Sequence, residues 1–543
     1  MDLSYRFCIE KPSRREAADP TVVRFKGLFF LFASKSGGYW YSADLAEWSF
    51  IETDQIPVED YAPTVVVLGE TLFFLASSTE RSAIYKSDNP LSGEWRVAAE
   101  ALETPVWDPA LFVDADNRLY LYWGSSNENP IYGVELDCNN NFAFIGSPKE
   151  LIYAHPSVYG WETPGDYNTL VNQKPWIEGP WVTRHNGKYY LQYACPGTEF
   201  KSYADGVYVS ENPLGPFSLQ LHNPFVYKPE GFAAGAGHGS SFANHYGNLW
   251  HIGTMTISQK HIFERRLGLF PAFLDDDGAF YSITKYGDYP LVIPEGKIKC
   301  FEDIFPGWML LTFGKKVTVS SSADNFPPQH ITDENIRTYW AAESGGDNEF
   351  AMVDMGELYD VFAIQINFAE HNTEIFGRMK NLFHRYTVEF STDGINWNLL
   401  IDKSKNETDN THNYIQLESK IDCRYLKINN IEVPGGNFAM SGFRAFGKGH
   451  GDLLGKITEF TAIRNQHDRR SVRLSWTKSH NATGYMISFG IDRNKLYHNY
   501  MVYGDTALTI NSLNSNLEYY FSIEAFNENG RTKGDKIILA TSK

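Results

Sequence analysis

The sequence lacks closely spaced cysteines and long hydrophobic runs. Its five cysteines are odd in number and scattered, with no CxxC pair, so neither a zinc site nor a dithiol redox centre is expected. We interpret them as buried small hydrophobic residues. No apolar run reaches the length of a bilayer, and the start, MDLSYRFCIEKPSRRE, has no apolar core of a signal peptide. Membrane insertion is therefore not expected.

Positive charge is also scarce. Lysine and arginine total 48 against 66 aspartates and glutamates, which gives a formal net charge of −18. Such a chain repels phosphate backbones and anionic lipid head groups, so nucleic acid is not an expected partner. No nucleophile elbow, Walker loop or HExxH motif is present either, which excludes most other enzyme classes. What remains is a chain of 543 residues, 43% of them hydrophobic, which is long enough for two to four domains.

A repeat dominates the first half of the chain. Each copy has a short apolar strand, a polar turn that usually contains glycine, and a second apolar strand, which is typical of a β-hairpin. The five copies are DPTVVRFKGLFFLFAS from Asp19, APTVVVLGETLFFLASS from Ala62, DPALFVDADNRLYLYWGSS from Asp108, EGPWVTRHNGKYYLQYA from Glu178 and GHGSSFANHYGNLWHIGT from Gly237. The spacings between the starts of the first three copies match the length of one four-stranded propeller blade. The longer spacings to the fourth and fifth copies match a blade plus insertions. We therefore predict an all-β chain in which residues 1–300 form a five-bladed β-propeller.

The residues that begin the copies are candidates for an active site. The innermost strand of each propeller blade runs along the central channel, so equivalent repeat positions face one another. These positions hold Asp19, Ala62, Asp108, Glu178 and His238. Asp-Pro and Glu-Gly-Pro also begin strands as ordinary turn residues. Three carboxylates at the same register favour a shared site instead.

Several carboxylates among tryptophans and tyrosines suit the hydrolysis of a glycosidic bond. One acid protonates the leaving oxygen, one base activates water, and aromatic faces stack on sugar rings. Glu178 is the best general acid, because Trp176 and Trp181 flank it and neighbouring carboxylates raise its pKa. Packing between blades is the alternative role of the two tryptophans. Strand alternation turns at least one of them away from the channel, so we expect one core and one rim position.

The repeat, together with ADP in the first copy, WDPAL in the third and IEGP in the fourth, resembles glycoside hydrolase family 43 over residues 15–300. The resemblance implies that Asp19 is the general base, that Asp108 orients the acid and modulates its pKa, and that Glu178 is the general acid. No cofactor is expected to be required. The family also tends to carry a histidine near the axis that binds calcium through water or supports the site, and GAGHGSSF places His238 there. A satisfied core histidine is the alternative.

Further substrate contacts are expected around these carboxylates. In HIFERRLGLFP the resemblance implies an arginine six residues before Pro271, which is Arg265, with ordinary surface ion pairs as the alternative. The insertion of residues 153–176 is expected to shape the mouth of the pocket with Trp161 and Tyr167, or else to cover a hydrophobic edge. The candidate substrate-binding residues are Trp40, Trp107, Trp161, Trp176, His238 and Arg265.

Two further β-sandwiches are expected after the propeller. Residues 314–448 contain VTVSSSADNFPPQHITDENIRTYWAAE and RYTVEFSTDGINWNLL and resemble a discoidin-type (factor V/VIII C-type) domain, which either binds carbohydrate or props the propeller. In residues 457–543, Leu513 and Tyr519 have the spacing of a tyrosine corner, so this segment resembles a fibronectin type III module. We interpret it as a spacer.

The roles implied by the resemblance make an inverting glycoside hydrolase the expected function. Exo action is expected because a narrow five-bladed funnel admits a chain end more easily than a chain middle. The expected enzyme removes terminal α-L-arabinofuranosyl, or related furanose or pentose, residues from polysaccharide side chains. A β-xylosidase, galactosidase or galactofuranosidase is the alternative among enzymes, and a non-catalytic lectin or adhesin is the alternative of another class. The expected partner is a polysaccharide or oligosaccharide. We expect a periplasmic or extracellular location with a leader that this chain lacks, or else a cytoplasmic one.

Overall fold

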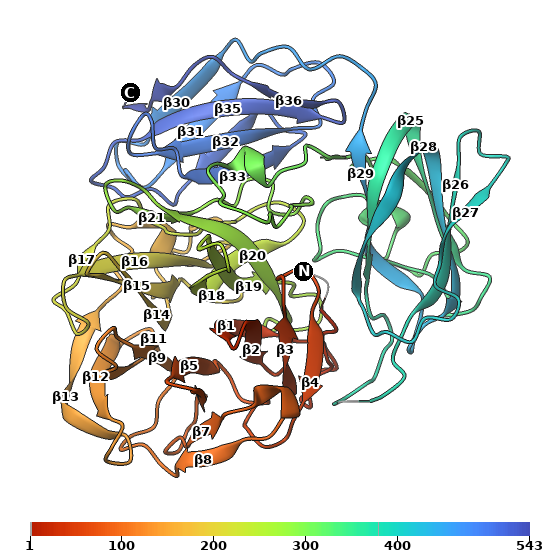
Figure 1. The fold of residues 1–543 in the computed structure, drawn as a ribbon. Coiled ribbons are helices and arrows are strands. Elements are labelled where there is room, and N and C mark those ends of the chain that lie inside the picture. The colour runs from red at the N-terminus through yellow and green to blue at the C-terminus, as the bar shows by residue number, and fades with distance from the viewer. Residues whose placement is uncertain (1–2, 378, 543) are drawn as a thin grey trace.

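Strands make up nearly all of the regular structure in this computed structural model, which describes residues 3–377 and 379–542 (Figure 1). Within these residues the helical segments are four short 3-10 helices: η1 (Pro90–Ser92), η2 (Gly160–Glu162), η3 (Phe301–Asp303) and η4 (Pro328–Ile331). None of the helices in the described part of the chain is long and apolar enough to cross a membrane. The all-β prediction is confirmed.

Five separate sheets arranged around an axis form the predicted propeller (Figure 1). Blade 1 contains β1 (Ala18–Phe25), β2 (Leu28–Ser34), β3 (Gly38–Ser42) and β4 (Ser49–Glu52). Blade 2 contains β5 (Thr64–Leu68), β6 (Thr71–Leu75), β7 (Ile84–Ser87) and β8 (Arg96–Ala99). Blade 3 contains β9 (Ala110–Val113), β10 (Leu119–Trp123), β12 (Ile131–Asp137) and β13 (Ala143–Ile152).

The last two blades are built in the same way and close the ring. Blade 4 contains β11 (Ser125–Ser126), β14 (Ile177–His185), β15 (Lys188–Cys195), β16 (Ala204–Ser210) and β17 (Ser218–Leu219). Blade 5 contains β18 (Ala234–Ala243), β19 (Leu249–Thr256), β20 (Arg265–Leu274) and β21 (Phe280–Ser282). The inner strands contact one another in order, β1 with β5, β5 with β9, β9 with β14, β14 with β18, and β18 with β1. Residues at the start of these strands therefore meet at the axis.

Tight turns explain why the repeat forms hairpins. β1 and β2 are joined by Lys26 and Gly27, which have φ angles of 48° and 83°, and β14 and β15 are joined by Asn186 and Gly187, with 47° and 79°. A two-residue turn with two left-handed residues matches the right-handed twist of paired strands. Glycine at the second position adopts this conformation without a steric penalty, so the sequence signal and the hairpin have the same cause.

The second sheet system follows the propeller. One sheet of eight strands contains β22 (Met309–Leu310), β23 (Lys316–Val319), β24 (Trp340–Ala341), β25 (Phe350–Phe368), β26 (Arg385–Ser391), β27 (Asn398–Asp402), β28 (His412–Glu432) and β29 (Ala439–Lys448). Its core includes the fully buried Trp340. Since β22 already pairs with β29, this sheet begins before residue 314. The predicted domain boundaries stay predictions.

The last segment forms two facing sheets. One contains β30 (Phe460–Arg464), β31 (Val472–Trp476), β34 (Ala507–Ile510) and β38 (Thr541–Ser542), and the other contains β32 (Gly484–Gly490), β33 (His498–Tyr503), β35 (Tyr520–Asn527), β36 (Gly530–Lys533) and β37 (Ile538–Leu539). The buried Tyr519 hydroxyl accepts a hydrogen bond from the Asn514 backbone N–H at 3.1 Å. This contact has the form of a tyrosine corner. The assignment to fibronectin type III stays a prediction.

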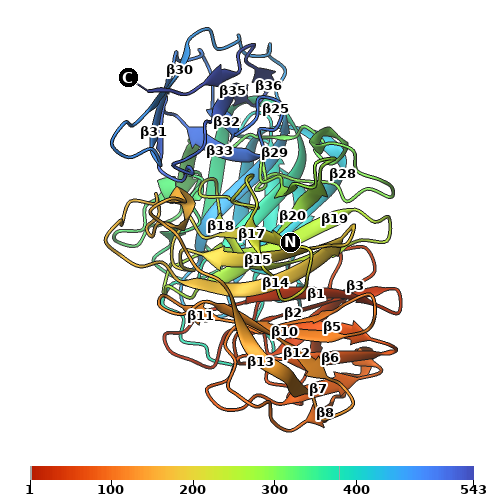
Figure 2. The same ribbon diagram turned by 90° about the vertical axis from the view of Figure 1, so that its left-hand side faces the viewer.

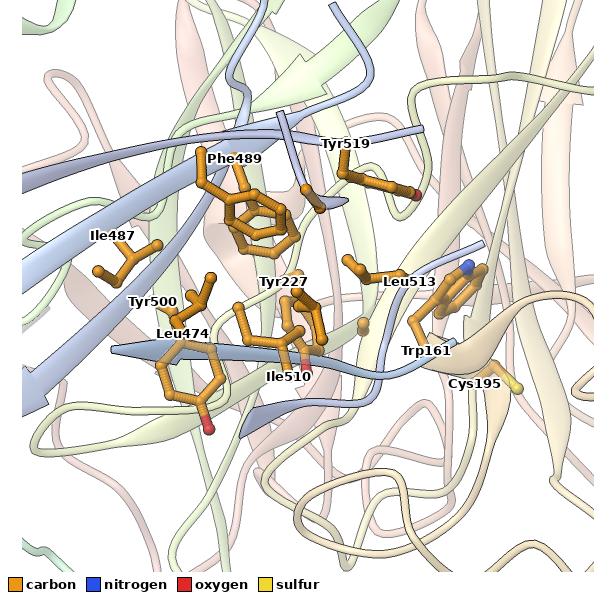
Figure 3. Close-up of a cluster of buried hydrophobic side chains, with 14 of the residues drawn as sticks. Trp161, Cys195, Tyr227, Leu474, Ile487, Phe489, Tyr500, Ile510, Leu513 and Tyr519 are labelled. Carbon is orange, nitrogen blue, oxygen red and sulfur yellow. The ribbon is translucent and has the colours of Figure 1, made fainter. Parts of the chain in front are cut away.

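The last sandwich lies against blades 4 and 5 rather than hanging free (Figures 1 and 2). The insertion of residues 153–176 is pinned to it, because the Gly160 N–H donates to the Leu513 carbonyl at 3.0 Å and the Ser515 N–H donates to the Val158 carbonyl at 2.8 Å. Trp161 has no exposed surface and packs in one cluster with Leu513 and Tyr519 (Figure 3). A spacer role alone does not account for this shared core.

Candidate active site

The axial ends of the five inner strands share one unusual backbone conformation. Asp19, Ala62, Asp108, Gly179 and His238 have left-handed φ angles of 54°, 48°, 49°, 57° and 44°. A residue with a side chain adopts such a conformation only where the surrounding structure imposes it. The equivalent position in blade 4 is therefore Gly179 rather than the glutamate before it. Glu178 reaches the axis from one residue earlier, which corrects the register predicted from the repeat.

Asp19 is held as an ionised carboxylate. Its Oδ2 accepts a hydrogen bond from Ser34 Oγ at 2.6 Å, and its Oδ1 lies 3.2 Å from Arg265 Nη1. The backbone N–H of Asp19 donates to Thr254 Oγ1 at 2.8 Å. Burial by itself raises the pKa of the Asp19 carboxyl, but the Arg265 charge and these hydrogen bonds outweigh it and lower the pKa below its usual value. An ionised carboxylate suits a general base.

Glu178 has the opposite environment. Its Oε1 accepts a hydrogen bond from the Tyr203 hydroxyl at 2.6 Å, and its Oε2 accepts one from Ser125 Oγ at 3.0 Å. Burial raises the pKa of Glu178 to about 7, the charge of Asp19 acts in the same direction, and the two hydroxyl donors oppose it. Glu178 therefore holds its proton below neutral pH, as a general acid must.

His238 lies within reach of both Asp19 and Asp108. His238 Nδ1 is 3.3 Å from Asp19 Oδ1 and 3.6 Å from Asp108 Oδ2. Burial and the charge of Glu178 raise the pKa of Asp108 well above its usual value, and burial lowers the pKa of His238, which keeps the imidazole neutral. The ring covers Gly179, where an added Cβ would lie 2.5 Å from its Cγ and Cδ2. The structure thus brings together all four predicted axial residues.

Two consecutive arginines point to opposite sides of β20. Arg265 is buried and contacts both Asp19 and Glu16, with its Nη2 2.7 Å from Glu16 Oε1. Arg266 is also buried, and its Nε donates to His412 Nε2 at 3.0 Å. Neither is a surface ion pair. Arg265 thus contacts one of the predicted catalytic carboxylates, and its role in substrate binding stays a prediction.

The four candidate tryptophans divide into two groups. Trp107 and Trp176, next to Asp108 and Glu178 in sequence, are both 43% exposed and lie at the rim. Trp40 is 1% exposed and packs in the core between blades 1 and 5 with Trp250. The predictions of Trp40 and Trp161 as substrate-binding residues are therefore wrong, because both rings are enclosed by protein. Trp181 is half-buried and its indole N–H donates to the Ser241 carbonyl of blade 5 at 3.1 Å.

The surroundings of His238 do not fit a calcium ion well. Calcium takes six to eight oxygen ligands, whereas the Nδ1 of His238 already faces the two aspartates and Asp19 is engaged by Arg265. Among the described residues, the group of three side chains that could share a metal is Asp360, Asp422 and His450, and Lys420 already pairs with Asp360 at 2.7 Å. Calcium stays a prediction, and no step of the chemistry below depends on it.

Sequence reasoning missed the hydroxyl groups that hold the carboxylates. Ser34 contacts Asp19, Ser125 contacts Glu178, and Ser77 Oγ accepts the Asp108 backbone N–H at 2.9 Å. A signal for these serines was present, because three copies of the repeat end in FAS, LASS and WGSS. Tyr203 and Glu16 lie outside the repeated segments and carried no comparable signal.

Comparisons with known proteins match two parts of the chain to known families. Residues 11–280 match the model of glycosyl hydrolases family 43, and residues 316–442 match the F5/8 type C domain. The arabinoxylan arabinofuranohydrolase of Paenibacillus polymyxa is 27% identical over 231 residues, which cover 37% of this chain and 33% of that protein. The arabinoxylan arabinofuranohydrolase of Bacillus subtilis is 25% identical over 303 residues, which cover 43% of this chain and 55% of that protein.

Other similarities are more limited. The β-xylosidase of Xylanibacter ruminicola is 25% identical over 134 residues, which cover 21% of this chain and 39% of that protein. A solved glycoside hydrolase overlays with a TM-score of 0.47 at 17% identity and covers 79% of this chain and 97% of that one. The chain thus spans about a third to a half of the length of these curated relatives. By these matches the propeller is similar to glycosyl hydrolases family 43, and the eight-stranded sheet that follows it is similar to the F5/8 type C domain.

Proposed function

We propose that the propeller is an inverting, exo-acting glycosidase that removes terminal α-L-arabinofuranosyl residues, or a related furanose or pentose, from polysaccharide side chains. The observation that carries the proposal is the opposite protonation of two buried carboxyls at one axis. Arg265 keeps Asp19 ionised, while burial holds the pKa of Glu178 at about 7. Hydrolysis of a glycoside requires this combination of base and acid.

The reaction follows from the two protonation states. Asp19 takes a proton from a water molecule as the water oxygen forms its bond to the anomeric carbon. The bond from that carbon to the leaving oxygen breaks on the opposite face, and Glu178 donates its proton to the leaving oxygen. Water and glycoside become a free sugar of inverted configuration and a shortened alcohol. Asp108, whose own pKa is raised well above its usual value by burial and by the charge of Glu178, orients the acid.

Limited access supports exo action on a small sugar. Asp19 and Asp108 are only 5% and 8% exposed, so the reacting carbon must enter a narrow site. Trp107 and Trp176 at the rim offer exposed faces to the next sugar units. The two arabinoxylan arabinofuranohydrolases among the relatives support arabinose as the sugar, and the β-xylosidase supports xylose as the alternative.

A substrate panel tests the proposal. Nitrophenyl α-L-arabinofuranoside, β-xyloside, galactopyranoside and galactofuranoside are compared for colour release, and arabinoxylan is analysed for its first products. We expect fastest release from the arabinofuranoside and a monosaccharide as the only early product. An early ladder of oligosaccharides would contradict exo action. Binding of polysaccharide without release of any sugar would favour a lectin.

A further inference from the structure

The base side of the active site is connected to the F5/8 type C domain through a buried chain of ion pairs. Arg265 Nη1 contacts Asp19 at 3.2 Å, while its Nη2 and Nε contact Glu16 Oε1 at 2.7 and 3.2 Å. Glu16 Oε1 thus holds the edge of the guanidinium group formed by Nε and Nη2, while Nη1 faces Asp19. Glu16 has no exposed surface, so its carboxylate cannot rotate into solvent.

The segment that carries Glu16 is paired with residues 6–8, because the Cys8 N–H donates to the Arg14 carbonyl at 3.0 Å and the Glu16 N–H donates to the Arg6 carbonyl at 3.2 Å. Residues 14–16 precede β1, and Arg14 pairs with the outer oxygen of Glu16, with Nη2 to Oε2 at 2.9 Å. The Ala17 N–H donates to the Arg265 carbonyl at 3.3 Å, which ties the end of the segment to β20. The position of the segment therefore sets where both Glu16 and Asp19 lie.

Arg15, in the middle of this segment, points away from the active site into the F5/8 type C domain. Its Nε is 2.5 Å from Glu370 Oε1 and its Nη1 is 2.7 Å from Asp409 Oδ2. Arg15 has no exposed surface, and the two carboxylate side chains are 4% and 9% exposed. Charge-assisted hydrogen bonds from two different nitrogens to two acids fix the direction of the Arg15 side chain as well as its distance. The Arg15 carbonyl also accepts a hydrogen bond from Arg266 Nη1 at 2.7 Å.

We propose that the F5/8 type C domain completes the base side of the catalytic site, with Glu16, Glu370 and Asp409 as positioning residues. Glu370 and Asp409 fix the position of Arg15. Because Glu16 directly follows Arg15, its carboxylate is positioned as well. Glu16 in turn holds Arg265 in contact with Asp19. The domain is then part of the catalytic machinery whether or not it also binds carbohydrate. The inference rests on the proposed role of Asp19 as the base.

Three variants of the full-length protein test this series of contacts. Glu16→Gln weakens the link next to Arg265, and the double variant Glu370→Gln with Asp409→Asn weakens the remote link. Ser13→Ala is the matched control, because Ser13 Oγ lies on the same segment and donates to the Ile375 carbonyl of the F5/8 type C domain at 2.6 Å without touching an arginine. Melting temperatures establish that each variant is folded.

The expected result is a fall in kcat of about tenfold or more for Glu16→Gln and for the double variant, with KM little changed, since small displacements of a catalytic group have effects of this size. The fold decrease in kcat should be the same on nitrophenyl arabinofuranoside and on arabinoxylan, because the hydrolysis of both substrates needs the base. A displaced general acid would instead lower kcat more on arabinoxylan, which has the poorer leaving group, than on the nitrophenyl glycoside. Ser13→Ala should keep the wild-type kcat.

Hydrogen exchange of residues 17–21 and 264–267 gives a readout that needs no turnover. We expect faster exchange there in the double variant than in Ser13→Ala. Wild-type kcat and wild-type exchange in both Glu16→Gln and the double variant would overturn the proposal. If the wild-type chain released no sugar from any substrate, the proposed function would fail, while the exchange measurement would still decide whether the domain holds the segment.

Discussion

Replacing Tyr203 by phenylalanine should shift the pH range of activity upwards. The Tyr203 hydroxyl donates a hydrogen bond of 2.6 Å to Glu178 Oε1 and is the strongest of the groups that lower the pKa of this carboxyl. The bond stabilises the carboxylate, so its loss favours the protonated acid. Glu178 acts while protonated, and activity falls as the pH rises through its pKa. The alkaline limb should therefore move to higher pH.

The size of the shift follows from the energy of the bond. A hydrogen bond to a charged group contributes about 1.5–3 kcal/mol, and each pKa unit corresponds to about 1.4 kcal/mol. The pKa of Glu178, about 7 in the wild type, should rise by about one to two units. The assay is kcat/KM against pH on a substrate with a poor leaving group, for which the acid is needed most.

Tyr193→Phe is the matched control for Tyr203→Phe. Tyr193 is a buried tyrosine of the same blade whose hydroxyl donates at 2.5 Å to another buried carboxylate, Glu162. Its loss should leave the alkaline limb in place. An alkaline limb of Tyr203→Phe that stayed at the wild-type pH or moved to lower pH would refute the assignment of Glu178 as the acid whose proton controls the rate.

Four further variants test other roles assigned above. Glu178→Gln should lower kcat on arabinoxylan by on the order of a hundredfold or more with an unchanged melting temperature, and equal turnover would contradict the acid role. Gly179→Ala should lower both stability and kcat, since the new Cβ would lie 2.5 Å from the His238 ring at a φ of 57°; a thermal melt and steady-state kinetics measure this. Trp161→Ala should lower the free energy of unfolding by about 3–5 kcal/mol, whereas Trp107→Ala should raise KM and leave the denaturation midpoint unchanged.

The repeat made the propeller and much of the site predictable. Each hairpin carries its own turn signal, and Asp19 and Asp108 stand before proline at equivalent positions. Glu178 was identified as the carboxylate that begins the fourth copy and from IEGP, although the left-handed position of blade 4 is occupied by Gly179, one residue later. Local patterns thus sufficed wherever the geometry is set within one blade.

The rest of the site depends on contacts between distant parts of the chain. Trp161 resembles a rim residue in sequence, yet it is covered by Leu513, more than 350 residues later. The spacing to a proline indicated Arg265, but its partner Glu16 comes from the other end of the propeller and meets it only when the ring closes. No local sequence pattern predicts a contact between residues this far apart in the chain.

Time-resolved proton NMR of the first sugar released from an arabinofuranoside tests the central claim most directly. If ionised Asp19 activates water opposite a leaving group protonated by Glu178, the first arabinose must have inverted anomeric configuration before it mutarotates, and Asp19→Asn should release it at least about a hundredfold more slowly. A first product with retained configuration, or an unimpaired Asp19→Asn variant, would contradict the account.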